Sequence, residues 1–215
     1  MDAVSYLALG RVFTANMTGN TVLLGLSLVQ RDLDGAGRSA LALGGFLVGG
    51  AIGAWIAYLG PREEGWPRGV TIALIIECVF LAALANDRSE LLGLRVVFAS
   101  IAMGIQSAAV RRLNVPGIAT TYVTGTLTTA VTSLVAGSRA ARPAAVEGSG
   151  RVEGVPATAH WWLGVRLQLF ALLIYGFGAT IGGLVYDRWP ALVAVLPFVA
   201  VTVVVAGAAR ARTRG

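Results

Sequence analysis

Apolar runs of about twenty residues, separated by short charged connections, fill this chain from one end to the other. The hydrocarbon core of a bilayer is about 30 Å thick, and an α-helix of roughly 20 apolar residues crosses it. The runs therefore predict an all-α, polytopic transmembrane helix bundle that forms a single integral membrane domain over residues 1–215. Seven spans are expected, at residues 13–30, 39–60, 69–86, 91–110, 115–137, 161–186 and 189–209, after an N-terminal stub at residues 1–10.

The composition excludes the common soluble classes. Hydrophobic residues make up 56% of the chain and charged residues 13%, whereas soluble domains carry about 25% charged residues. The net charge is +6, but the arginines stand singly between apolar runs, so we expect no nucleic-acid partner. One cysteine, Cys78, and one histidine, His160, cannot form a usual metal site or a nucleophile and base pair. We expect no cofactor, no metal and no enzymatic activity.

The arginines also predict an orientation, because cytoplasmic loops of membrane proteins carry the excess of basic residues. One set of loops and ends holds Arg31, Arg38, Arg88, Arg139, Arg142, Arg151, Arg210, Arg212 and Arg214. The opposite set holds Arg11, Arg62, Arg68, Arg111, Arg112 and Arg188. The larger set includes the C-terminal tail, so the tail is expected in the cytoplasm.

Two halves of the sequence resemble one another. Residues 13–20 (FTANMTGN) align with residues 119–126 (ATTYVTGT), and each block opens an apolar helix. Gly53 aligns with Gly182 in the following helix, and Trp66 aligns with Trp189 in the connection after it. We interpret these matches as an internal duplication, because three blocks recur in the same order.

The first repeat then covers about residues 1–87 and the second about 91–211, which includes a flexible loop at 138–160 rich in Ala, Gly and Pro. Asp2 to Ser5 corresponds to residues 106–109, so most of one helix is expected upstream of Met1 in a complete protein. The complete chain would have four helices in each half. An even number predicts that the two repeats are parallel, related by an axis along the membrane normal.

Polar residues within the apolar runs are the candidate functional groups. Threonines recur at spacings of three and four in both halves, which places each set on one face of a helix. A duplicated bundle would bring the two faces together around a substrate pathway, where Gly residues allow an interrupted helix. The alternative is packing, since threonine hydroxyls bond back to their own helix. The pathway residues expected are Asn16, Thr18, Gly19, Asn20, Thr121, Thr124, Gly125 and Thr128.

Glu77 stands in the middle of an apolar run, where an ionisable side chain costs at least ~2.5–3.5 kcal/mol. It is either a coupling acid for protons or cations, or a structural residue, in an ion pair with Arg95 or Arg166 or as a protonated acid bonded to a carbonyl group. Gly45, Gly49 and Gly53 recur at every fourth residue and predict a close helix contact, either within the chain or with a second copy in a homo-oligomer.

The run DAVSYLALGRVF at residues 2–13, followed by TANMTGNTVLLG at 14–25, resembles the signature of the YoaK-like family of bacterial integral membrane proteins. The Thr18-Gly19-Asn20 core carries the resemblance, and the helix layout extends it over essentially the whole chain. Members usually begin upstream of the residue that corresponds to Asp2. The family is a domain of unknown function, so the resemblance implies a multi-pass protein of the bacterial inner (cell) membrane and no particular activity.

From these features we expect a small-molecule secondary transporter or permease in the lipid bilayer, with its unknown substrate near the two Thr-Gly segments. The competing interpretation is a membrane scaffold or regulator that transports nothing and whose small residues serve helix packing. A water-accessible cavity at the Thr-Gly segments would distinguish the two.

Overall fold

A computed structural model describes residues 1–58, 66–86, 91–113, 123, 125, 127–128, 131–132, 134–135, 161–189, 192 and 195–212. The chain divides into two compact units, one of residues 1–114 with 178–215 and the other of residues 115–177. The helices are α1 (Asp2–Ala8), α2 (Met17–Gln30), α3 (Leu33–Ala57), α4 (Arg68–Asn86), α5 (Leu92–Arg112), α7 (Trp161–Arg188) and α8 (Val195–Arg212). The expectation of an all-helical protein is confirmed for the described residues.

Three helices in the described ranges are long and apolar enough to cross a membrane, namely Leu33–Ala57, Leu92–Arg112 and Val165–Arg188. Val195–Gly207 is a shorter apolar helix. Their outer faces carry large apolar side chains that water would not favour, and Leu47 and Trp55 of α3 are 71% and 70% exposed. A lipid surface is the environment that such faces require.

α2 and α3 form a tight helical hairpin. Arg31 ends α2 in the left-handed conformation, with φ 59°, and Asp32 caps α3 by accepting a hydrogen bond from Gly35 N at 2.9 Å. The predicted span at residues 39–60 therefore begins too late. A single charged turn joins the helices because the αL residue reverses the chain and the aspartate satisfies the first amides.

α3 packs directly on α5, and the two helices run in the same direction. A methyl group placed on Gly53 would lie 2.7 Å from the Cα of Ile105, and one on Gly45 would lie 3.1 Å from the Cβ of Ser100. Gly49 faces the backbone of Ile101 between them. The partner of the glycine face is thus a helix of the same chain. Of the two alternatives for this close contact, the structure shows the one within the chain, because α5 occupies the glycine face that a second copy would need.

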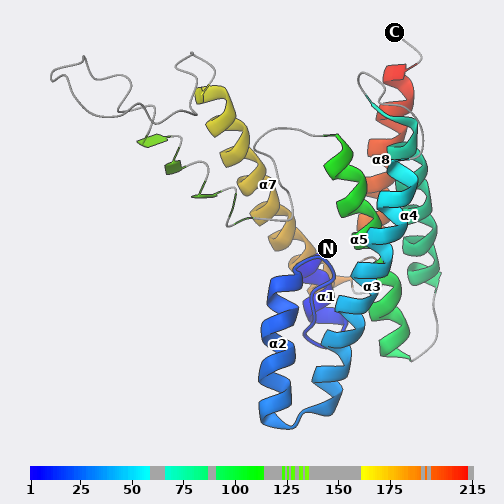
Figure 1. The fold of residues 1–215 in the computed structure, drawn as a ribbon, viewed down its shortest axis with the longest axis vertical. Coiled ribbons are helices and arrows are strands. Elements are labelled where there is room, and N and C mark those ends of the chain that lie inside the picture. The colour runs from blue at the N-terminus through cyan, green and yellow to red at the C-terminus, as the bar shows by residue number, and fades with distance from the viewer. Residues whose placement is uncertain are drawn as a thin grey trace, which may run out of the picture. The chain divides into compact units, whose positions relative to one another are not determined.

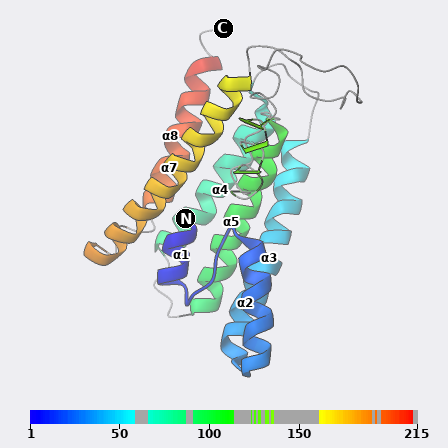
Figure 2. The same cartoon turned by 90° about the vertical axis from the view of Figure 1, so that its left-hand side faces the viewer.

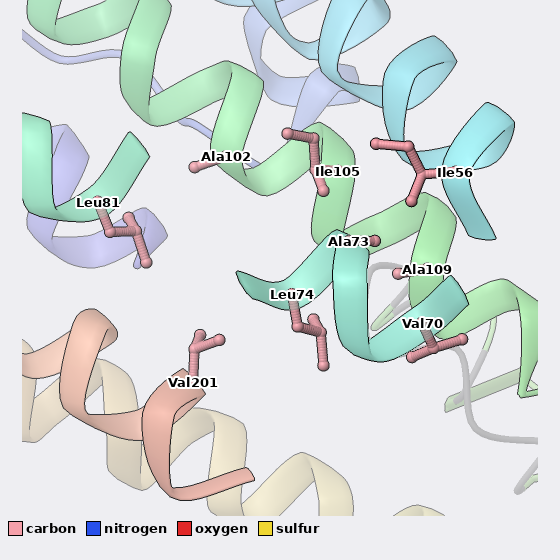
Figure 3. Close-up of a cluster of buried hydrophobic side chains, with 9 residues drawn as sticks. All are labelled: Ile56, Val70, Ala73, Leu74, Leu81, Ala102, Ile105, Ala109 and Val201. Carbon is pink, nitrogen blue, oxygen red and sulfur yellow. The ribbon is translucent and has the colours of Figure 1, made fainter. Parts of the chain in front are cut away.

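α4 runs in the direction opposite to α3 and α5 (Figure 1). Its start lies against the end of α3, where a methyl group on Gly69 would lie 2.7 Å from the carbonyl oxygen of Ile56. Further along, the rings of Phe80 and Phe98 meet edge to face at 5.9 Å. Figure 3 shows apolar side chains of α3, α4, α5 and α8 turned toward one another. This cluster consists of Ile56, Val70, Ala73, Leu74, Leu81, Ala102, Ile105, Ala109 and Val201.

The C-terminal ends of α3, α5 and α8 lie at one end of the first unit (Figures 1 and 2). Arg112, at the end of α5, stacks over the Tyr58 ring that follows α3, with its guanidinium carbon 4.7 Å from the ring centroid. The sequence-based assignment of Arg68, Arg111 and Arg112 to the side opposite the C-terminal tail is therefore wrong. The predicted sides alternate correctly from Arg31 to Arg112, as the directions of α3, α4 and α5 do, so the discrepancy arises between Arg112 and Arg188 (Figure 1).

α1 and α2 both run toward the N-terminal ends of α3 and α5. The start of α1 is bonded to the residues just before α2, and Gly10, after α1, lies beside Arg38 and Leu92. The two helices therefore run in the same direction, side by side, with the chain returning between them (Figure 2).

This arrangement overturns the prediction of parallel repeats. The predicted counterparts α1 and α5 run in opposite directions, and so do α4 and α8 (Figures 1 and 2). The prediction failed because it counted α1 and α2 as two crossings, which made the number of helices in each half even.

In the second unit, the residues of α7 up to Phe177 form a continuous helix, and Val165 and Gln168 are buried. Among residues 115–137 the described positions are helical, namely Val123, Gly125, Leu127, Thr128, Val131, Thr132, Leu134 and Val135. The expected pathway residues Thr121 and Thr124 lie outside the described residues, as does the predicted loop at 138–160.

Candidate functional site

The residues just before the Thr-Gly pair of the first half form an irregular segment, here called the break, between α1 and α2 and beside α3 and α5. α1 ends at Ala8, and eight residues of irregular chain precede Met17. Gly10 and Arg11 both have positive φ, 75° and 64°, which turns the chain back along α1. Leu9 and Val12 then pack with apolar residues of α3 and α5. The predicted helix over residues 13–30 therefore starts at Met17.

Asp2 holds this irregular chain in place. One carboxylate oxygen, Oδ1, accepts hydrogen bonds from the backbone amides of Thr14, Ala15 and Asn16 at 3.1, 2.8 and 3.4 Å. Three consecutive amides around one oxygen form an anion-binding concavity. The chain thus fills this concavity with its own side chain.

Asn20 holds the same segment from the other side. Its Oδ1 accepts from Phe13 N at 2.9 Å, and its Nδ2 donates to Phe13 O at 2.7 Å. Arg38 Nε donates to Gly10 O at 3.1 Å. Irregular backbone in an apolar setting is stable only where its polar groups are paired, and these side chains provide the pairing.

The other predicted residues of this segment have simpler positions. Asn16 is the N-cap of α2 and accepts from Gly19 N at 3.0 Å. Gly19 lies against the Phe13 ring, where a methyl group would come within 2.9 Å of it. Thr18 is exposed. Both asparagines are therefore bonded to backbone. Gly19 lies within α2, so the helix is not interrupted at this glycine, and the irregular chain ends before it at Asn16.

Thr14 leaves one polar atom of the break unpaired. The residue is fully buried, and its Oγ1 has no hydrogen-bond partner among the described residues. An unpaired buried hydroxyl costs about 1–3 kcal/mol. It lies on the same residue whose amide donates to Asp2.

In the second half, the described pathway residues Gly125 and Thr128 are helical and exposed. The carbonyl of Thr128 accepts a hydrogen bond from Thr132 Oγ1 at 2.9 Å. Thr21 in the first half makes the same kind of bond to Met17 O, also at 2.9 Å. These are the bonds back to the helix that the packing alternative predicts.

Glu77 is the second candidate site. It is completely buried, and in the described part of the chain neither carboxyl oxygen has a hydrogen-bond partner. The hydrogen-bonded ion pair with Arg95, one of the structural alternatives, is not formed. The neighbouring Cys78 Sγ lies 4.0 Å from Thr202 Oγ1 of α8, and Glu77 shares its helix face with Leu74 and Leu81 of the apolar cluster. The carboxyl group therefore lies in apolar surroundings.

Asp2 was not among the predicted site residues. Its hydrogen bonds join residues twelve to fourteen positions apart. The spacing of residues along a helix cannot predict contacts over such a separation. The signal in the sequence was Asp2, a charged residue within the apolar N-terminal stub that leads to Gly10 and Arg11.

Comparison with known proteins places the chain in a family. The family model described as "Protein of unknown function (DUF1275)" matches residues 1–208. The chain belongs to the DUF1275 family. Within the curated proteins it is 41% identical, over 132 residues, to the UPF0700 transmembrane protein YoaK of Bacillus subtilis (strain 168).

That alignment covers 59% of this chain and 58% of YoaK, so the match spans less than two thirds of the relative. No solved structure matches. The predicted resemblance to the YoaK-like family is confirmed, and with it the location in a membrane. DUF1275 membership supplies no activity, so any function has to be argued from the site.

Proposed function

We propose that this DUF1275 protein is a secondary transporter of a small molecule, with Glu77 as the acid that couples transport to protons or cations. The observation that carries the proposal is the complete burial of a carboxyl group that has no hydrogen-bond partner on either oxygen among the described residues. An ionised side chain there would cost at least ~2.5–3.5 kcal/mol, so in this conformation the group holds a proton.

Releasing that proton requires water or a cation to reach the carboxyl group. A conformation in which α4 separates from α5 or α8 would provide the access, because these helices contribute the apolar residues around it. A change between a closed and an opened form is what coupled transport needs.

The competing function is a scaffold or regulator in the membrane. One observation favours it: the side chains of Asn16 and Asn20 both form hydrogen bonds with backbone groups of the same segment. Under this proposal the break is a structural feature and Glu77 a tolerated neutral acid.

Proton movement in reconstituted vesicles tests the transporter. Purified protein is placed in liposomes that enclose a pH-sensitive dye, and gradients of a solute panel are imposed. Wild type should show solute-driven proton movement, and Glu77→Gln should abolish it because the amide keeps the shape and cannot ionise. Cys78→Ser is the matched control on the same helix and should retain it. Equal proton movement in wild type and Glu77→Gln would refute the role of Glu77.

Water access at the Thr-Gly segments separates the two functions. In a Cys78→Ser background, single cysteines at Thr18, Asn20, Thr124 and Thr128 are exposed to a membrane-impermeant thiol reagent. A transport pathway predicts labelling in both halves and protection by a transported solute. Absence of labelling at all four in folded protein would favour the scaffold.

The orientation belongs to the same proposal. Within the described part of the first unit, more arginines lie at the end where α3, α5 and α8 terminate than at the opposite end, the former being Arg68, Arg111, Arg112, Arg210 and Arg212 and the latter Arg11, Arg31, Arg38 and Arg188. The positive-inside rule then places it, and the C-terminal tail, in the cytoplasm.

A further inference from the structure

We infer that the two halves of the chain form an inverted repeat, in which corresponding helices cross the membrane in opposite directions about a pseudo-twofold axis in the membrane plane. The inference concerns topology. It holds or fails independently of the proposed transport.

The first observation is a helix contact that occurs twice. Gly53 of α3 lies against Ile105 of α5, and Gly182 of α7 lies against Val4 of α1, where a methyl group would come 3.1 Å from its Cγ2. Gly53 and Gly182 are counterparts in the two sequence repeats. Val4 is the counterpart of Ala108, which lies one turn beyond Ile105 on the same face of α5. The third helix of each half therefore contacts the first helix of the other half: α3 contacts α5, and α7 contacts α1.

The second observation is direction. α3 and α5 run the same way, as their successive contacts from Gly45 and Ser100 to Gly53 and Ile105 show. The Gly178–Arg188 part of α7 and α1 also share a direction, but it is opposite to that of α3 and α5 (Figures 1 and 2). An axis along the membrane normal preserves the direction of every helix. A twofold axis perpendicular to the helices, in the membrane plane, relates the α3–α5 pair to the α7–α1 pair and reverses the helix direction.

The inversion requires that α1 and α2 together count as one crossing. α1 and α2 run in the same direction, α3 runs in the opposite direction, and α4 returns (Figure 2). With α1 and α2 as one crossing, the first half crosses an odd number of times, and a duplicated segment with an odd number of crossings inserts its second copy upside down. The bonds from Asp2 and Asn20 hold the returning chain between α1 and α2, which gives both helices the same direction.

The inversion also locates the candidate substrate site. In inverted-repeat proteins the binding site lies at the interface of the repeats, beside their discontinuous helices. Here the break packs through Leu9 and Val12 on Val96 and Ala99 of α5, the first helix of the other half. The repeat interface and the helix break therefore coincide.

Sidedness of labelling tests the inference. Single cysteines replace the exposed residues Tyr58, Arg210, Asp34 and Trp189 in a Cys78→Ser background, and an impermeant maleimide is applied to spheroplasts and to inside-out vesicles. Tyr58 and Trp189 follow corresponding helices of the two repeats. The inverted repeat predicts that they label from opposite sides, with Arg210 on the side of Tyr58 and Asp34 on the side of Trp189.

Labelling of Tyr58 and Trp189 from the same side would overturn the inference and restore parallel halves. Arg188, exposed and adjacent, replaces Trp189 if that variant does not fold. The assay requires no substrate, so its outcome is distinct from that of the proton measurement.

Discussion

Replacing Asn20 by leucine should destabilise the break while keeping the volume of the side chain. Asn20 is fully buried, and the change removes both of its hydrogen bonds to Phe13. Leaving a buried amide and a buried carbonyl unpaired costs about 1–3 kcal/mol each. Burial of the apolar leucine side chain returns about 1.5–3 kcal/mol. The expected net loss is about 2 kcal/mol.

For a chain of this size, 1 kcal/mol corresponds to roughly 2–4 °C, so the melting temperature of Asn20→Leu in detergent should fall by about 4–8 °C. Thr21→Val is the matched control, because it removes one exposed hydrogen bond to Met17 O and should change the melting temperature by no more than about 2 °C. Differential scanning fluorimetry measures both. Equal melting temperatures for the two variants would refute the view that Asn20 holds the break.

Three further predictions concern the other contacts. Gly49→Ala should lower the free energy of unfolding by about 1–3 kcal/mol because the new methyl group meets the backbone of Ile101. Gly44→Ala is the control: its methyl group would enter open space, so the free energy of unfolding should stay the same or rise. Chemical unfolding measures both variants. Asp2→Ala should increase proteolysis between α1 and α2 far more than Asp2→Asn, which keeps an oxygen for the amides; equal cleavage would contradict the role of the carboxylate oxygen. Dicyclohexylcarbodiimide should modify Glu77 in membranes, because it reacts with protonated carboxyl groups in apolar surroundings. Mass spectrometry should detect the adduct in wild type and not in Glu77→Gln. An unmodified Glu77 in wild type would argue against a neutral buried acid.

The sequence was sufficient for the helical class and for the positions of several helices. α4 and α5 were expected at residues 69–86 and 91–110 and are found at Arg68–Asn86 and Leu92–Arg112. Apolar runs flanked by charge report such helices directly, because burial in lipid depends on the hydropathy of each residue. The spacing of Gly45, Gly49 and Gly53 likewise predicted a close contact between helices.

The break before α2 could not be read in the same way. Residues 13–16 are compatible with a helix, and the tertiary bonds from Asp2 and Asn20 hold them in an irregular conformation. Such bonds join residues far apart in the sequence, so hydropathy and periodicity do not indicate them. Glu77 could be found because a charged residue in an apolar run is conspicuous, but the packing that leaves its oxygens without a partner in the described ranges is a property of the assembled helices.

The contact between α3 and α5 limits how the protein can move. Glycines on α3 and Gly104 on α5 each place backbone against backbone, with no flexible side chain between the two helices. Sliding one helix along the other would drive a carbonyl group into a neighbouring Cα, so the pair behaves as a single rigid body. Any opening that exposes Glu77 must therefore come from helices that surround the pair. In a two-fold arrangement, the equivalent pair of α7 and α1 would be the second rigid body, and motion would consist of one pair rocking against the other.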